Sequence, residues 1–82
     1  MKKLLYFSAP WCAPCKMFGP KIQQMSQEGI PVEKIDVSID QDAVSRYSIH
    51  SVPTVILWEN NREKARFTGV KSKEEIKQFY GQ

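Results

Sequence analysis

The pair Cys12 and Cys15, which follows the apolar run Leu4–Phe7, constrains this chain of 82 residues more than any other feature. Residues three apart on a helix lie one turn apart on the same face, with Cβ atoms about 5–6 Å apart. A disulfide spans nearly this separation, so the pair can close and open with little backbone movement. A helix that begins at the first cysteine also lowers the pKa of its thiol. Because thiolates attack disulfides, the spacing indicates a dithiol–disulfide redox catalyst.

The redox interpretation assigns different roles to the two cysteines. Cys12, at the helix start, is the expected nucleophile, and Cys15, one turn later, is expected to resolve the mixed disulfide. A pair of cysteines buried only for packing is the plainer alternative. Two cysteines and one histidine, His50, are too few ligands for a closed zinc site, so no metal is expected. We also expect no bound cofactor, since the Cys12–Cys15 disulfide is itself the redox group.

Composition limits the class of protein. A length of 82 residues suits a single small domain over residues 1–82. The net charge of +3 comes from Lys and Arg scattered among Asp and Glu, without the basic stripe of a nucleic-acid binder. No run approaches the roughly 20 apolar residues of a membrane span, and the apolar run near Met1 is too short for a secretory signal. We therefore expect a cytoplasmic protein, without nucleic-acid or membrane partners, that is monomeric.

Hydrophobic spacing predicts the elements of the first half. The continuous apolar run Leu4–Phe7 is typical of a strand buried on both faces. A helix is predicted from Cys12 or Ala13 to Gly29, with a kink at Pro20. Its apolar face repeats at helical spacing and comprises Phe18, Ile22 and Met25.

The second half continues the alternation of strands and helices. Ile35, Val37 and Ile39 alternate with polar residues and predict a second strand, after which Asp40 caps a short helix that ends at Tyr47. The later strands are a central one at Thr54–Trp58 and an outer one at Ala65–Thr68, joined by a turn at Asn60-Asn61. The capping box Ser72 and Glu75 opens a last helix, whose inner face comprises Ile76, Phe79 and Tyr80. The order β-α-β-α-β-β-α predicts an α/β fold with a four-stranded mixed sheet flanked by three helices on both faces.

Over nearly its whole length the chain resembles the thioredoxin family, in its minimal form without the extra N-terminal strand and helix. The cysteine pair and a Val-Pro-Thr triplet about forty residues later form a specific combination. The matching residues are Ala9, Trp11, Cys12, Pro14, Cys15, Lys16, Pro20, Lys34, Tyr47, Ile49, Val52-Pro53-Thr54 and Gly69.

The resemblance implies a protein disulfide oxidoreductase that acts mainly as a reductase. Its substrates would be proteins that contain disulfides, and its electron donor would be a thioredoxin reductase. It also implies a cis peptide bond before Pro53, beside the disulfide. The expected substrate-binding residues are Trp11, Ala13, Pro14, Val52, Pro53 and Thr54.

Two departures from the family pattern concern the surroundings of the cysteines. Ala13 replaces the usual glycine between them, and Tyr6 replaces the usual buried acid beneath the second cysteine. Lys34 matches the family position near that acid, so Tyr6 and Lys34 are auxiliary candidates.

Two other functions remain open at this stage. The short chain and the lead-in Phe7–Pro10 also resemble glutaredoxins, which use glutathione, although their usual basic residue and Gly-Gly pair are absent. The second is a binding module with an incidental dithiol. Catalysis of insulin disulfide reduction would separate an enzyme from such a module.

Overall fold

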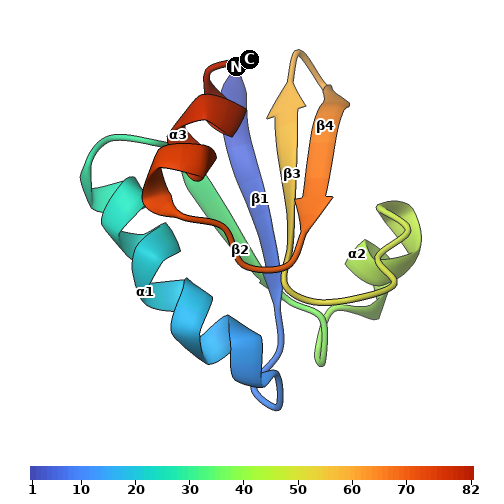
Figure 1. The fold of residues 1–82 in the computed structure, drawn as a ribbon. Coiled ribbons are helices and arrows are strands. Elements are labelled where there is room, and N and C mark those ends of the chain that lie inside the picture. Colours follow the sequence, from blue (N-terminus) through green and yellow to red (C-terminus); the bar gives the residue numbers. More distant parts are fainter.

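The apolar run before the cysteines forms β1 (Lys2–Ser8), which lies inside a four-stranded sheet of order β2-β1-β3-β4. A computed structural model describes all residues, 1–82, and Figure 1 shows their arrangement. The predicted β-α-β-α-β-β-α order is confirmed. The other elements are α1 (Ala13–Gln27), β2 (Val32–Asp36), α2 (Gln41–Arg46), β3 (Thr54–Glu59), β4 (Arg62–Thr68) and α3 (Lys73–Tyr80).

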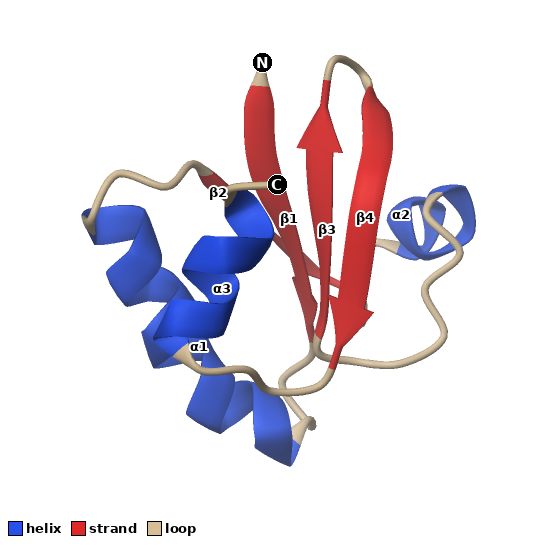
Figure 2. Cartoon of the chain, turned by 45° about the horizontal axis from the view of Figure 1, so that its top comes forward, coloured by secondary structure: helices blue, strands red, loops and turns tan.

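Helices cover both faces of the sheet, with α1 and α3 on one face and α2 on the other (Figure 2). Side chains of a strand alternate between its faces, so β1 contributes to two cores. Leu4 and Tyr6 pack with α1 and α3, whereas Leu5 and Phe7 pack toward α2. The expected apolar faces of α1 and α3 lie in the first core, which includes Phe18, Ile22, Met25 and Ile76, with Phe79 and Tyr80 against it.

The predicted second strand was wrong in position. β2 spans Val32–Asp36 and pairs in parallel with Leu4–Ser8, so it begins and ends earlier than the alternation of Ile35, Val37 and Ile39 suggests. The carboxylate of Asp36 accepts hydrogen bonds from the N–H and hydroxyl of Ser38, at 2.9 and 2.6 Å. This local turn ends the strand, and Ile39 is 81% exposed.

The predicted caps and turns are confirmed. Asp40 accepts a hydrogen bond from the N–H of Ala43 at 3.0 Å, and Ser72 with Glu75 forms the full capping box of α3. The hairpin between β3 and β4 turns at Asn60 and Asn61, whose φ angles are 56° and 65°. α1 continues through Pro20 and ends before Gly29, which has a φ of 105°.

None of the helices combines the length and the apolar character that crossing a membrane requires.

Candidate active site

Cys12 and Cys15 form a disulfide where β1 leads into α1, at the lower end of the sheet in Figure 1. Their Cα atoms are 5.2 Å apart. Cys12 is the N-cap of α1 with an extended backbone, and Pro14 lies in the first turn, where its missing N–H costs no helical hydrogen bond. The N–H of Cys15 donates to the Sγ atom of Cys12 at 3.2 Å.

The position of Cys12 favours a thiolate on this residue. Its sulfur lies at the positive end of the helix and already accepts one backbone N–H, and both effects stabilise a negative charge. Burial does not distinguish the two cysteines, because 4% of Cys12 and 6% of Cys15 is exposed. Helix position and hydrogen bonding therefore separate their chemistry.

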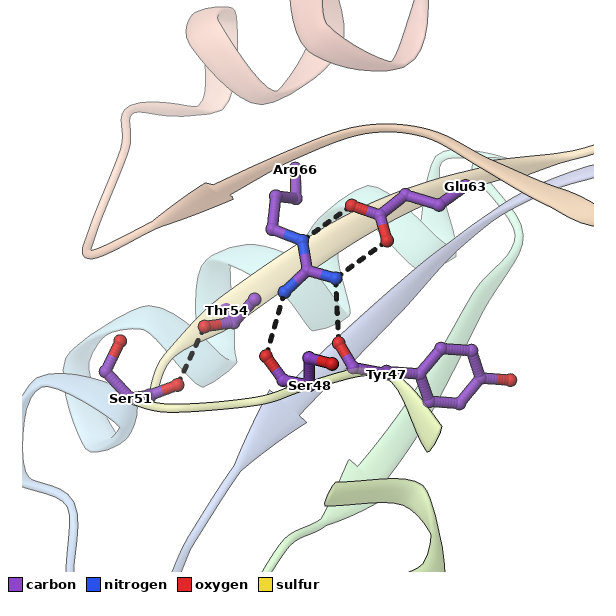
Figure 3. Close-up of polar contacts among 6 residues, drawn as sticks. All are labelled: Tyr47, Ser48, Ser51, Thr54, Glu63 and Arg66. Carbon is purple, nitrogen blue, oxygen red and sulfur yellow. Dashed lines mark hydrogen bonds and ion pairs between the residues drawn. The ribbon is translucent and has the colours of Figure 1, made fainter. Parts of the chain in front are cut away.

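The segment that precedes β3 lies next to the disulfide. The Val52-Pro53 peptide bond is cis, as expected, and the carbonyl oxygen of Val52 lies 3.7 Å from the Sγ atom of Cys12. The carbonyl of Pro53 accepts a hydrogen bond from the N–H of Gly69 at 3.0 Å. The hydroxyl of Thr54 donates to the carbonyl of Ser51 at 2.7 Å (Figure 3). These bonds hold the segment next to Cys12.

An apolar hollow of about 460 Å³ is bordered by Trp11, which precedes Cys12 in the chain, and by Val52, whose carbonyl lies next to the Cys12 sulfur; we call it the Trp11 groove. The indole of Trp11 is its most prominent wall, because 71% of this residue is exposed. The residues that line it are Trp11, Val37, Gln41, Val44, Ile49, His50, Ser51 and Val52.

The structure brings only some of the expected substrate-binding residues to this groove. Trp11 and Val52 line it. Ala13 and Pro14 are exposed on the first turn of α1, whereas Pro53 and Thr54 are buried, and none of the four lines the groove. Sequence reasoning missed Val37, Gln41, Val44, Ile49, His50 and Ser51 as part of the wall.

A second cavity, of about 430 Å³, lies on the Cys15 side between α1 and β2; we call it the Tyr6 cavity. The hydroxyl of Tyr6 donates to the carbonyl of Cys15 at 3.4 Å, and burial raises the pKa of Tyr6 above its usual value. Lys34 lies opposite Tyr6 in the register of β1 and β2. The lining contains no carboxylate and consists of Tyr6, Cys15, Lys16, Gly19, Pro20, Ile22, Gln23, Ser26, Val32 and Lys34.

Tyr6 and Lys34 therefore lie where the resemblance placed them, on the Cys15 side of the disulfide. A phenol whose pKa is raised above its usual value stays protonated near neutral pH, so Tyr6 cannot accept the proton of Cys15. No group of three or more His, Cys, Asp or Glu side chains is arranged to hold a metal ion.

Comparison with known proteins agrees with this geometry. The family model described as Thioredoxin matches residues 1–82. The thioredoxin of Mycoplasma pneumoniae is 36% identical, with 99% of this chain and 81% of that protein covered. The thioredoxin of Chlamydia trachomatis is 33% identical, with 89% and 74% covered. A mutant thioredoxin from Halobacterium salinarum superposes with a TM-score of 0.90 at 29% identity, covering 96% of this chain and 71% of that one.

A four-stranded mixed sheet with a Cys-x-x-Cys disulfide at the start of its first helix defines a thiol–disulfide oxidoreductase. The chain belongs to the thioredoxin family.

Proposed function

We propose that this protein reduces disulfides in other proteins, with Cys12 as the nucleophile and Cys15 as the resolving thiol. The observation that carries the proposal is the hydrogen bond from the Cys15 N–H to the Cys12 sulfur at the N-cap of α1. This bond and the helix dipole favour the thiolate on Cys12, and the thiolate is the attacking species.

The reaction takes place in two exchanges. The Cys12 thiolate attacks one sulfur of the substrate disulfide, which forms a mixed disulfide and releases the other substrate sulfur as a thiolate. Cys15, after losing its proton, then attacks the Cys12 sulfur and releases the second substrate thiol. The substrate gains two electrons and two protons, and the protein is left with the Cys12–Cys15 disulfide. A dithiol donor restores the reduced protein.

The proton of Cys15 needs an acceptor other than a side-chain carboxylate. The Tyr6 cavity reaches Cys15 and offers polar groups and room for water. Hydroxide or buffer ions that enter with this water can take the proton. Tyr6 holds the backbone of Cys15 and does not act as a base.

An extended protein segment is the substrate that the Trp11 groove fits. The N–H of Val52 donates to no group of the chain, and its carbonyl contacts only the Cys12 sulfur. A substrate strand can pair with these backbone groups while its side chains contact Trp11 and Val37. A site that pairs with the substrate backbone and offers its side chains an apolar wall has only a weak preference for the substrate's sequence.

A thioredoxin reductase is the proposed electron donor, rather than glutathione. Binding the carboxylates of glutathione calls for cationic groups and free helix N–H groups near the site. Here the lead-in Ala9-Pro10-Trp11 carries no charge, and the carboxylate of Glu75 already accepts the N–H of Ser72 at the start of α3. This negative charge disfavours a second carboxylate there.

We further propose that residues 1–82 work as one monomeric domain in the cytoplasm. Both hydrophobic cores lie on the same sheet, which supports one folding unit. A reductase needs a continuous supply of electrons, which a reducing compartment provides.

Reduction of insulin by dithiothreitol, with and without the protein, tests the proposed function. Insulin should precipitate faster when the protein is present, and the Cys12→Ser variant should give the rate of dithiothreitol alone. No acceleration by the unaltered protein would favour a binding module. Faster reduction of the oxidised protein by glutathione than by a thioredoxin reductase with NADPH would instead favour a glutaredoxin-like function.

A further inference from the structure

Arg66, on the outer strand β4, holds the segment that carries Val52, although it belongs to none of the motifs described above. Arg66 lies on β4, and its guanidinium donates to two backbone carbonyls after α2 (Figure 3). Its Nη2 atom lies 2.7 Å from the carbonyl oxygen of Tyr47, and its Nη1 atom lies 3.2 Å from that of Ser48.

These two carbonyls have no other partner in the chain. α2 ends at Arg46 with Tyr47 as its C-cap, Ser48 adopts a φ of 53°, and the N–H of Ile49 donates to the carbonyl of Val44 at 3.0 Å. This arrangement closes the helix but leaves the carbonyls of Tyr47 and Ser48 without a backbone donor. Arg66 supplies the missing donors and puts a positive charge at the negative end of α2.

A β-bulge orients the arginine. Trp58 pairs with Glu63 and Leu57 with Ala65, so Lys64 is the extra residue of β4. Residues three apart on a regular strand face opposite sides, but the extra residue places Glu63 and Arg66 on the same side. Both Glu63 oxygens accept from Arg66, Oε2 from Nε at 2.6 Å and Oε1 from Nη2 at 2.7 Å. This two-point contact fixes the plane of the guanidinium.

The clamped backbone leads directly to the groove. Ile49, His50, Ser51 and Val52 follow Ser48 without interruption, and all four line the Trp11 groove. Arg66 holds one end of this segment, and the bond from Thr54 to Ser51 holds the other. Directly after the Ser51 anchor, the N–H of Val52 makes no hydrogen bond within the chain.

We propose that Arg66, oriented by Glu63, is a positioning residue for protein substrates: it fixes the segment from Ser48 to Val52 so that the Val52 backbone is ready to pair with a substrate strand. The inference rests on the proposed substrate groove. Arg66 touches neither cysteine, so it acts on substrate binding and leaves the thiol chemistry unchanged.

The test compares a protein substrate with a small one. In Arg66→Gln we expect the KM for insulin to rise about fivefold, because hydrogen bonds from a charged group to two carbonyls are lost. The kcat for insulin and the rate with the small disulfide reagent DTNB, which does not need the groove, should stay within about twofold. Glu63→Gln should raise the KM less than Arg66→Gln does. Arg66→Lys should keep part of the affinity, because the lysine ammonium reaches the carbonyls but lacks the rigid, forked geometry of the guanidinium.

A matched control lies on the same strand. The side chain of Arg62 makes no hydrogen bond, so Arg62→Gln removes the same charge from β4 without touching the clamp. Its KM for insulin should equal that of the unaltered protein. Thermal unfolding of every variant shows which are folded at the assay temperature. If Arg66→Gln is unfolded there, the KM values of Arg66→Lys and Glu63→Gln are compared with that of Arg62→Gln instead.

Trp11→Ala separates failure of the clamp from failure of the groove. A raised KM in Trp11→Ala with an unchanged KM in folded Arg66→Gln would overturn the clamp alone. An unchanged KM in both variants would overturn the groove as well. Equal losses with insulin and DTNB in Arg66→Gln would show a general structural defect and also overturn the positioning role.

Discussion

Two hollows of similar size flank the disulfide, yet their linings differ in the chemistry they offer. The Trp11 groove has a volume of about 460 Å³ and the Tyr6 cavity about 430 Å³. Both linings are mainly apolar, but the groove contains no Lys, Arg, Asp or Glu and presents an exposed indole and the unpaired backbone of Val52. The cavity reaches Cys15 and carries Tyr6, Lys16 and Lys34.

The difference shows that volume alone does not identify a substrate site. Apolar surface next to free backbone groups binds an extended protein segment. Polar groups next to the resolving cysteine can bind water instead, and the Tyr6 hydroxyl contacts its carbonyl. We therefore assign substrate binding to the Cys12 side and proton release to the Cys15 side, and the following predictions test that division.

The largest effect should come from the cysteines themselves. Cys12→Ser should abolish turnover, because no nucleophile remains, whereas Cys15→Ser should accumulate mixed disulfides that cannot be resolved. Mass spectrometry after incubation with oxidised insulin would detect them. Mixed disulfides that form in Cys12→Ser and not in Cys15→Ser would reverse the two roles.

A change in the groove should affect substrate binding strongly. Trp11→Ala removes the exposed indole, and we expect the KM for insulin to rise about tenfold, which corresponds to about 1.4 kcal/mol. Lys34→Ala, in the Tyr6 cavity, is the matched variant and should change that KM by less than about twofold. Steady-state rates over a range of insulin concentrations provide both values. A larger effect from Lys34→Ala would place the substrate on the Cys15 side.

A change in the cavity should affect the rate only mildly. Tyr6→Phe removes a hydroxyl that stays protonated near neutral pH and whose hydrogen bond to Cys15 is long, 3.4 Å. We expect kcat for insulin to change by less than about fivefold, because one weak hydrogen bond contributes less than about 1 kcal/mol. A loss of several orders of magnitude would make the hydroxyl essential and contradict the division between the two sides.

The smallest effect should appear only in alkaline solution. Burial raises the pKa of Tyr6 in the folded protein, so its contribution to stability is complete below the unfolded pKa of about 10 and is lost as the pH rises further. Tyr6→Phe should weaken this alkaline loss. Thermal unfolding of both proteins at neutral and at alkaline pH measures it. Identical alkaline losses in the two proteins would show that Tyr6 is not the group responsible.

Sequence patterns predicted the elements well, because local signals specify them. Asp40, Gly29 and the Ser72–Glu75 box fix helix ends through hydrogen bonds to residues a few positions away. The end of β2 could not be predicted from alternation, since the turn at Asp36 and the parallel pairing with β1 determine it.

The site was only partly predictable for a related reason. Trp11, Cys12 and Cys15 lie within five consecutive positions of the sequence, so their motif places them together. Val37 and His50 reach the groove only through the tertiary fold, and a single sequence gives no sign of it. The Glu63–Arg66 contact depends on a bulge at Lys64, and strand alternation alone would put the two side chains on opposite faces.

The most direct test of the central claim locates a trapped substrate. A peptide with one cysteine would be joined to Cys12 of the Cys15→Ser variant, and backbone amide shifts would be compared by NMR with those of the same variant capped by a small thiol. We predict peptide-dependent shifts at the groove residues Val37, His50 and Val52, with little change at Gln23, Ser26 and Lys34 of the cavity. Shifts concentrated at the cavity residues would contradict the assignment of substrate to the Cys12 side.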